Sequence, residues 1–193
     1  EPVDWSRAFR ELADGLRFIR SHELVRGVMI GVGAGLVGGA SIIPLGRSFV
    51  EGVLHAGNAG YGLLLTSVGT GVAAGVLVFS AAHRKLAREL FFTAGLVMCG
   101  IALVLAASLQ VLALVVMATA AMGFAGGAAY VCGVTILQEE VTDELRGRTF
   151  ATLFTVARFS VLFALAAAPF LAGALDSLSE ALFDDKGVEF VGI

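Results

Sequence analysis

The sequence predicts an all-α integral membrane protein: a bundle of five transmembrane helices preceded by an amphipathic linker helix. Its composition is 58% hydrophobic and only 15% charged, with a mean hydropathy of +0.89. Soluble domains average about 45–50% apolar and about 25% charged residues. The stretch from Leu90 to Gln138 contains no Asp, Glu, Lys or Arg. Basic residues gather between the apolar stretches, as they do in the loops of membrane proteins.

The uncharged stretch is too long for one membrane crossing. At the helical rise of about 1.5 Å per residue it would extend about 70 Å, whereas a hydrocarbon core is about 30 Å thick. Its polar break is Ser108-Leu109-Gln110, so we expect a short turn there between two antiparallel helices. A soluble fold would have to bury both helices on every side, and a chain of this length has no core large enough.

The remaining spans are bounded by charged residues. We expect a first span from Gly27 to about Gly46, kinked near Pro44, and a second from about Ala59 to Ala82. A fifth follows Arg148 and runs to about Leu175. The predicted organisation is a linker helix over residues 1–25, a five-span bundle over 26–175, and an extracytoplasmic acidic loop or tail over 176–193. Because the start lacks the apolar core of a signal peptide, we expect a piece of a longer protein.

The linker helix is predicted from an apolar repeat at intervals of four and three, opposite an arginine-rich face. The repeat consists of Trp5, Phe9, Leu12, Leu16 and Ile19. Such a helix lies on a membrane surface or packs on its own protein, and the sequence leaves both alternatives open.

Glycines recur every four residues in the first span, at Gly27, Gly31, Gly35 and Gly39. This spacing predicts a helix-packing stripe along which a neighbouring helix can approach closely. A moving contact in a transporter and static packing are both compatible with the stripe, and static packing is the simpler interpretation.

Basic residues indicate the orientation. With five spans, one side of the bilayer receives nearly all of them: Arg7, Arg10, Arg17, Arg20, Arg26, Arg84, Lys85, Arg88, Arg146 and Arg148. Only Arg47 and Lys186 fall on the other side. The positive-inside bias makes the crowded side cytoplasmic. We therefore expect a multi-pass protein of the cell membrane, with its start cytoplasmic and its end extracytoplasmic.

The predicted cytoplasmic turn between the fourth and fifth spans carries Gln138 and then the run Asp143-Glu144-Leu145-Arg146-Gly147-Arg148. This turn resembles that between the tenth and eleventh helices of exporter-like transporters of the major facilitator superfamily. The resemblance implies the linker and helices seven to eleven of such a transporter. It also implies, as partners, an N-terminal six-helix half and a twelfth helix. The chain departs from the family after its second span, where the expected acidic residue is absent.

The same resemblance implies a cytoplasmic gating role for the turn. Its candidate residues are Glu139, Glu140, Asp143, Arg146, Gly147 and Arg148. Carboxylates complement the partial positive charge of a helix start, and the arginines can reach headgroups or facing carboxylates. A latch that closes one alternating-access state and simple topological anchoring by arginine both fit this pattern.

We expect no enzyme activity, cofactor or metal site, and no nucleic-acid partner. The spans contain no catalytic constellation and no cluster of metal ligands, and no basic run is typical of nucleic-acid binding. Gly31-Val32-Gly33-Ala34-Gly35 has no lysine to hold a phosphate. Cys99 and Cys132 lie inside apolar helices and are expected to be core residues.

Arg158 is the candidate contact for a substrate. It lies ten residues after Arg148, about 15 Å along a helix and near the middle of the hydrocarbon. Either its side chain reaches back to the inner face, or it faces a cavity and meets an anionic substrate or a carboxylate from the missing half. Phe154 and Leu162 would line the same cavity face.

Two functions follow from these expectations. In the first, the chain is part of a secondary active transporter that exports an unknown small molecule by alternating access. The alternative is a membrane domain without transport activity that anchors or assembles an attached domain. A nucleotide kinase is one such domain, because some relatives in the resembling family carry a thymidylate kinase.

Overall fold

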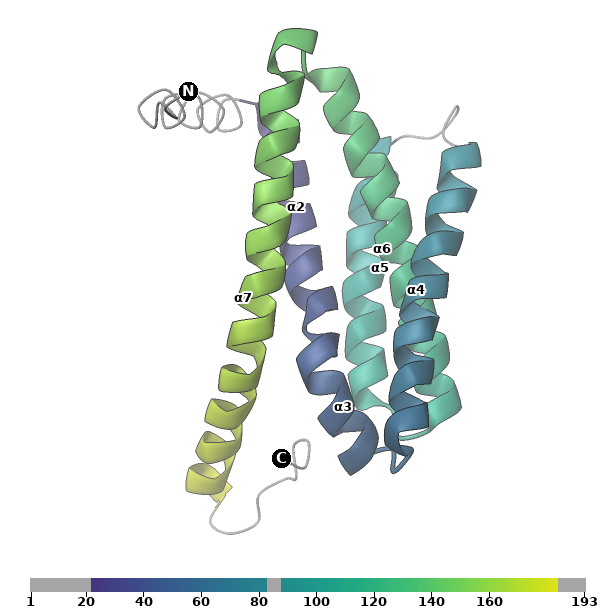
Figure 1. The fold of residues 1–193 in the computed structure, drawn as a ribbon, viewed down its shortest axis with the longest axis vertical. Helices are drawn as coiled ribbons and strands as arrows, with labels where there is room; N and C mark the ends of the chain where they lie inside the picture. Colours follow the sequence, from purple (N-terminus) through teal and green to yellow (C-terminus); the bar gives the residue numbers. More distant parts are fainter. Residues whose placement is uncertain (1–21, 83–87, 184–193) are drawn as a thin grey trace, which may run out of the picture.

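The computed structural model describes residues 22–82 and 88–183, and this part of the chain is built from α-helices (Figure 1). The helices are α2 (Glu23–Ala40), α3 (Ile42–Gly52), α4 (Gly57–Ala82), α5 (Arg88–Ser108), α6 (Leu112–Glu140) and α7 (Asp143–Phe183). Successive spans run in opposite directions, so the connections gather at two opposite ends of a bundle. The predicted linker helix lies outside the described residues except for 22–25.

Five helical spans in the described residues are long and apolar enough to cross a membrane, with α2 and α3 together forming the first. The predicted all-helical architecture with five spans is therefore confirmed at this level. The uncharged stretch divides as expected, because α5 ends at Ser108 and α6 begins at Leu112. Insertion and orientation in a bilayer remain predictions.

The first span is interrupted at Ser41 and is longer than predicted. Pro44 has no amide hydrogen to donate to the carbonyl of Ala40, and its ring crowds that carbonyl. The break therefore falls three residues before the proline. The helix resumes when the amide of Leu45 donates to the carbonyl of Ser41 at 3.2 Å, and α3 continues to Gly52 rather than to Gly46.

The last helix, α7, also differs from the prediction at both ends. It begins at Asp143, so the charged run forms its first turns and only two residues join it to α6. It continues to Phe183, so residues 176–183 are helical instead of a loop or tail. Hydropathy marks where a helix leaves the hydrocarbon, but leucine, alanine and glutamate favour helix beyond that point.

The central helix α6 packs on α4 through two glycines from each helix, and none of the four was among the predicted packing glycines. Gly71 and Gly75 on α4 face Gly123 and Gly127 on α6, and a methyl group added at any of the four would overlap a backbone carbonyl oxygen of the facing helix. The two backbones are therefore in direct contact.

A buried hydrogen bond ties the same pair of helices. It joins the hydroxyl oxygens of Ser67 and Thr119 at 2.7 Å. In an apolar interior, hydroxyl groups that bond across helices avoid the cost of an unsatisfied polar group. The bond and the glycine contact together make α4 and α6 one packed unit.

Large apolar side chains cover much of the outer surface of the bundle. Leu77 on α4 is 70% exposed, Leu90 on α5 is 66% exposed, and Phe170 on α7 is 81% exposed. Exposed apolar surface on this scale is unfavourable in water and favourable in hydrocarbon. The surface therefore agrees with the membrane location that the composition predicts.

Replacing Gly75 with Ala should destabilise the bundle. The added methyl group must push α4 away from the α6 backbone, and overpacking of this kind costs about 1–3 kcal/mol. Thermal unfolding in detergent should show a lowered midpoint. The matched control is Gly69→Ala on the same helix, because a methyl group at Gly69 has no neighbour within 4 Å in the described residues. Equal midpoints for both variants would contradict the close contact.

Single cysteines at Ser108 and Glu140 should label from opposite sides of the membrane. Both residues are exposed, and α6 separates them. In a background with Cys99 and Cys132 replaced by Ala, an impermeant maleimide applied to intact cells should reach position 108 alone. Position 140 should react only after permeabilisation. Labelling of both positions from outside would refute the five-span topology.

Candidate functional site

One end of the bundle carries the charged turn between α6 and α7. Arg146 lies in the first turns of α7, where its Nη1 is 2.9 Å from Oδ1 of Asp143 and its Nη2 donates to the carbonyl of Gln138 at 3.1 Å. Carbonyls at a helix end lack partners within the helix, so a cation there is favourable. Arg146 therefore holds the start of α7 against the end of α6.

Glu139 makes an ion pair with Arg88, which joins the end of α6 to the start of α5. The sequence interpretation considered Arg146 and Arg148 as partners for this glutamate and missed Arg88. Each of the two charges is unfavourable at its own helix terminus, because a cation lies at an N-terminus and an anion at a C-terminus. Their pairing offsets both effects. Antiparallel α5 and α6 bring the two residues to the same end of the bundle. The sequence could have indicated this pair, because the predicted turn at Ser108 already makes the two helices antiparallel.

The other residues assigned to gating lie on the same end. Glu140 and Arg148 are exposed, and a methyl group added at Gly147 would have no described neighbour within 4 Å. The turn thus brings together carboxylates and arginines from α5, α6 and α7. A gating role for this charged end remains a prediction.

The predicted glycine stripe on α2 contacts a neighbouring helix over its middle part. A methyl group at Gly31 would overlap the side chains of Phe92 and Leu96 on α5, and one at Gly35 would lie 3.2 Å from Leu96. At Gly27 and Gly39 a methyl group would meet no described atom within 4 Å. The two central glycines are therefore the ones that allow α2 to approach α5.

Arg158 lies near the middle of the apolar part of α7, which runs from Leu145 to Ala174. Its side chain is exposed, as are those of Phe154 and Leu162, which are 54% and 62% exposed. The face of α7 that packs on α2 is a different one: a methyl group at Gly33 would lie 3.3 Å from both Val156 and Ser160. Within the described residues, Arg158 makes no ion pair.

A cavity with a volume of about 350 Å³ lies between α2, α5, α6 and α7, with α4 closing one side. Val161 contributes the wall from α7, whereas Phe154 and Leu162 do not line it. Cys99 and Tyr130 also lie on its wall. The sequence did not single out Val161 or Tyr130, although Val161 is only three residues from Arg158.

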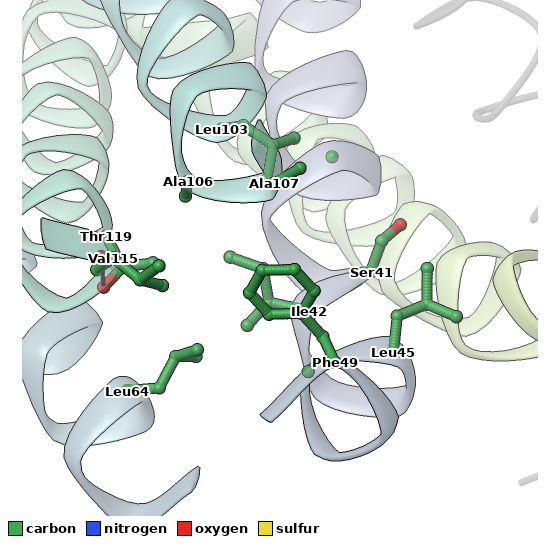
Figure 2. A pocket seen from close by; sticks show the side chains of 12 residues that line it. Ser41, Ile42, Leu45, Phe49, Leu64, Leu103, Ala106, Ala107, Val115 and Thr119 are labelled. Carbon is green, nitrogen blue, oxygen red and sulfur yellow. Dashed lines mark hydrogen bonds between the residues drawn. The ribbon is translucent and has the colours of Figure 1, made fainter. Parts of the chain in front are cut away.

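A second cavity, of about 310 Å³, lies near the other end of the bundle, where α3 meets α4, α5 and α6 (Figure 2). Ile42 and Phe49 of α3 line it. Its two hydroxyl groups are already engaged: Ser41 donates to the carbonyl of Val37 at 2.7 Å, and Thr119 bonds to Ser67. The other residues that line this cavity are apolar.

The described residues contain no group of His, Cys, Asp and Glu side chains that could hold a metal ion. No protein-family model matches the sequence, and no curated protein or solved structure matches it either. The fold thus defines a class, an all-helical bundle with five apolar helices of membrane-spanning length. Assignment to a particular family of transporters is a proposal.

Replacing Arg88 with Gln, or Glu139 with Gln, should leave an unpaired charge at a helix terminus where it is unfavourable. Because the side chains are 27% and 55% exposed, we expect each single change to cost at most about 1 kcal/mol. The double variant should cost less than the sum of the two, as measured by thermal unfolding in detergent. Arg47 and Glu51, an exposed pair within α3, provide the control cycle. Strict additivity at Arg88 and Glu139 would show that the pair contributes nothing.

Proposed function

We propose that the chain is part of a secondary active transporter that exports a small molecule by alternating access, as the C-terminal half of a protein of the major facilitator type. The observation that supports this most directly is Arg158, a charge in the middle of an apolar span with no ion-pair partner among the described residues. A central arginine costs about 2.5 to more than 10 kcal/mol in a membrane, depending on the method. Charges at this depth are rare and commonly mark substrate or ion pathways.

The uneven packing of the helices also supports a moving assembly. The helices α4 and α5 pack closely on α6, whereas α7 packs mainly on α2 and α3 (Figure 1). A cavity of about 350 Å³ separates parts of these two groups. Alternating access uses groups of helices that move as rigid bodies around a site near the middle of the membrane. In this proposal, the charged end links the two groups where α6 joins α7.

The alternative is a membrane domain that anchors or assembles an attached domain, such as a nucleotide kinase. In its favour, the carboxylates of the described residues lie at helix ends or beyond Ala174, so the described spans offer none at depth for a proton relay. A domain that only anchors has no use for Arg158, and that residue makes transport the better proposal.

Replacing Arg158 with Gln in the full-length protein should lower transport by about tenfold or more. In this proposal the guanidinium pairs with a charge of the substrate away from water, and truncating one partner of such a pair costs about 2–5 kcal/mol. Energised inverted membrane vesicles would be assayed for uptake of carboxyfluorescein, an anion, and ethidium, a cation. Arg47→Gln is the matched control, since that arginine is exposed and pairs with Glu51 at the other end of the bundle.

The control variant should retain the wild-type rate, and insertion and expression of both variants should be normal. If wild-type vesicles take up both probes no faster than vesicles without the protein, the anchoring alternative is favoured. If Arg158→Gln transports normally, Arg158 is a structural residue and the site lies elsewhere.

A further inference from the structure

The cavity of about 350 Å³ has the size and the wall of a small-molecule site. Sites of this kind occupy about 300–1,000 Å³ and are mostly apolar, with a few polar groups that orient the ligand. Val32, Leu96, Met122 and Val161 supply apolar surface from four different helices. Tyr130 is the one lining residue that has a hydroxyl group, and none of the lining side chains is charged.

Arg158 is level with the end of this cavity at which Val32 lies. The turn of α7 that contains it is placed against Gly33, since a methyl group there would lie 3.3 Å from both Val156 and Ser160. Val32, the neighbour of Gly33, lines the cavity. Arg158 does not itself line the cavity, but residues three apart on a helix are surface neighbours, and Val161, three residues on, does line it.

If the Arg158 side chain does not reach back to the inner face, its complement has to be an anion that reaches the middle of the membrane. The guanidinium of Arg158 is a positively charged group with five N–H donors and no acceptor. Phospholipid phosphates lie at the interface, about 15 Å away if the hydrocarbon core is about 30 Å thick. A second copy of this chain would offer no carboxylate at this level within its described residues, because theirs lie at helix ends or beyond Ala174.

We propose that the cavity and Arg158 form a binding site for a small lipophilic organic anion, which is the substrate class of the proposed transporter. The apolar body of the ligand occupies the space between α2, α5, α6 and α7. Its carboxylate or sulfonate meets the guanidinium of Arg158 at the cavity edge, and the hydroxyl of Tyr130 on the wall can bond to a polar atom of the ligand. The inference rests on the proposed function for its physiological meaning, but binding can be measured without transport.

Two fluorescent probes with nearly the same apolar body separate the roles of the charge and the cavity. 1-Anilinonaphthalene-8-sulfonate carries a sulfonate, and N-phenyl-1-naphthylamine is its neutral relative. Full-length protein in phosphatidylcholine nanodiscs should bind both probes saturably, after the signal of empty nanodiscs is subtracted. The Arg158→Gln variant should weaken binding of the sulfonate by about tenfold or more and leave the neutral probe unchanged. Arg158→Lys should largely restore binding of the sulfonate.

Filling the cavity should abolish binding of both probes. Gly126 lines the cavity, and a methyl group added there would meet only Cys99 Sγ within 4 Å among the described atoms, at 3.9 Å. Gly126→Leu therefore places a large side chain in the space without a clash at Cβ. Gly69→Leu is the matched control on α4, where a methyl group meets no described neighbour within 4 Å. Thermal unfolding of each variant identifies any loss of binding that comes from misfolding.

Three results would overturn the inference. They are equal affinity of the Arg158→Gln and wild-type proteins for the sulfonate, undiminished binding by a folded Gly126→Leu variant, and no saturable binding of the sulfonate by the wild-type protein. Failure of the transport proposal looks different, because a protein that binds the sulfonate as described but moves no solute would refute transport alone.

Discussion

Every backbone amide and carbonyl in a hydrocarbon environment needs a hydrogen-bond partner from the protein, and the helical architecture of the described chain meets that requirement. Within a helix the partners lie on the same segment, so each apolar stretch of the described chain forms a helix. The break between α2 and α3 shows that the helical pattern is lost over only a short stretch. Pro44 removes one donor, and the helix is interrupted for a single residue, Ser41, before the bonding pattern resumes.

Once the helices have formed, small residues decide how they assemble. Lipid tails are as apolar as leucine, so burial of leucine side chains gives little preference for one arrangement of helices over another. Backbone contact at Gly71, Gly75, Gly123 and Gly127 does give such a preference, and the hydrogen bond between Ser67 and Thr119 adds a polar link. The contact makes α4 and α6 a compact pair, and α7, which packs mainly on α2 and α3, lies apart from it.

Most charged side chains of the described helices lie near the ends of the bundle. At one end of the bundle Arg88 pairs with Glu139, and this pairing offsets two charges that are unfavourable at their helix termini. At the same end Arg146 pairs with Asp143 and donates to an open carbonyl at the end of α6. Arg158 departs from this pattern because it lies in the middle of an apolar span without an ion-pair partner in the described residues. Because Val161, three residues further along α7, lines an apolar cavity, we propose a ligand site there.

The sequence by itself determined the number of spans, the turn after Ser108, the helix break caused by Pro44 and the mid-span depth of Arg158. These properties follow from local chemistry: hydropathy, charge and the missing amide of proline act on the segment that carries them. Only the tertiary structure decided that Arg88 is the partner of Glu139, that Gly71 and Gly75 meet α6, and that Val161 and Tyr130 share a cavity. Such contacts join residues far apart in the chain, and their geometry depends on how helices rotate and cross, which the hydropathy pattern of a helix that is apolar on all sides does not encode.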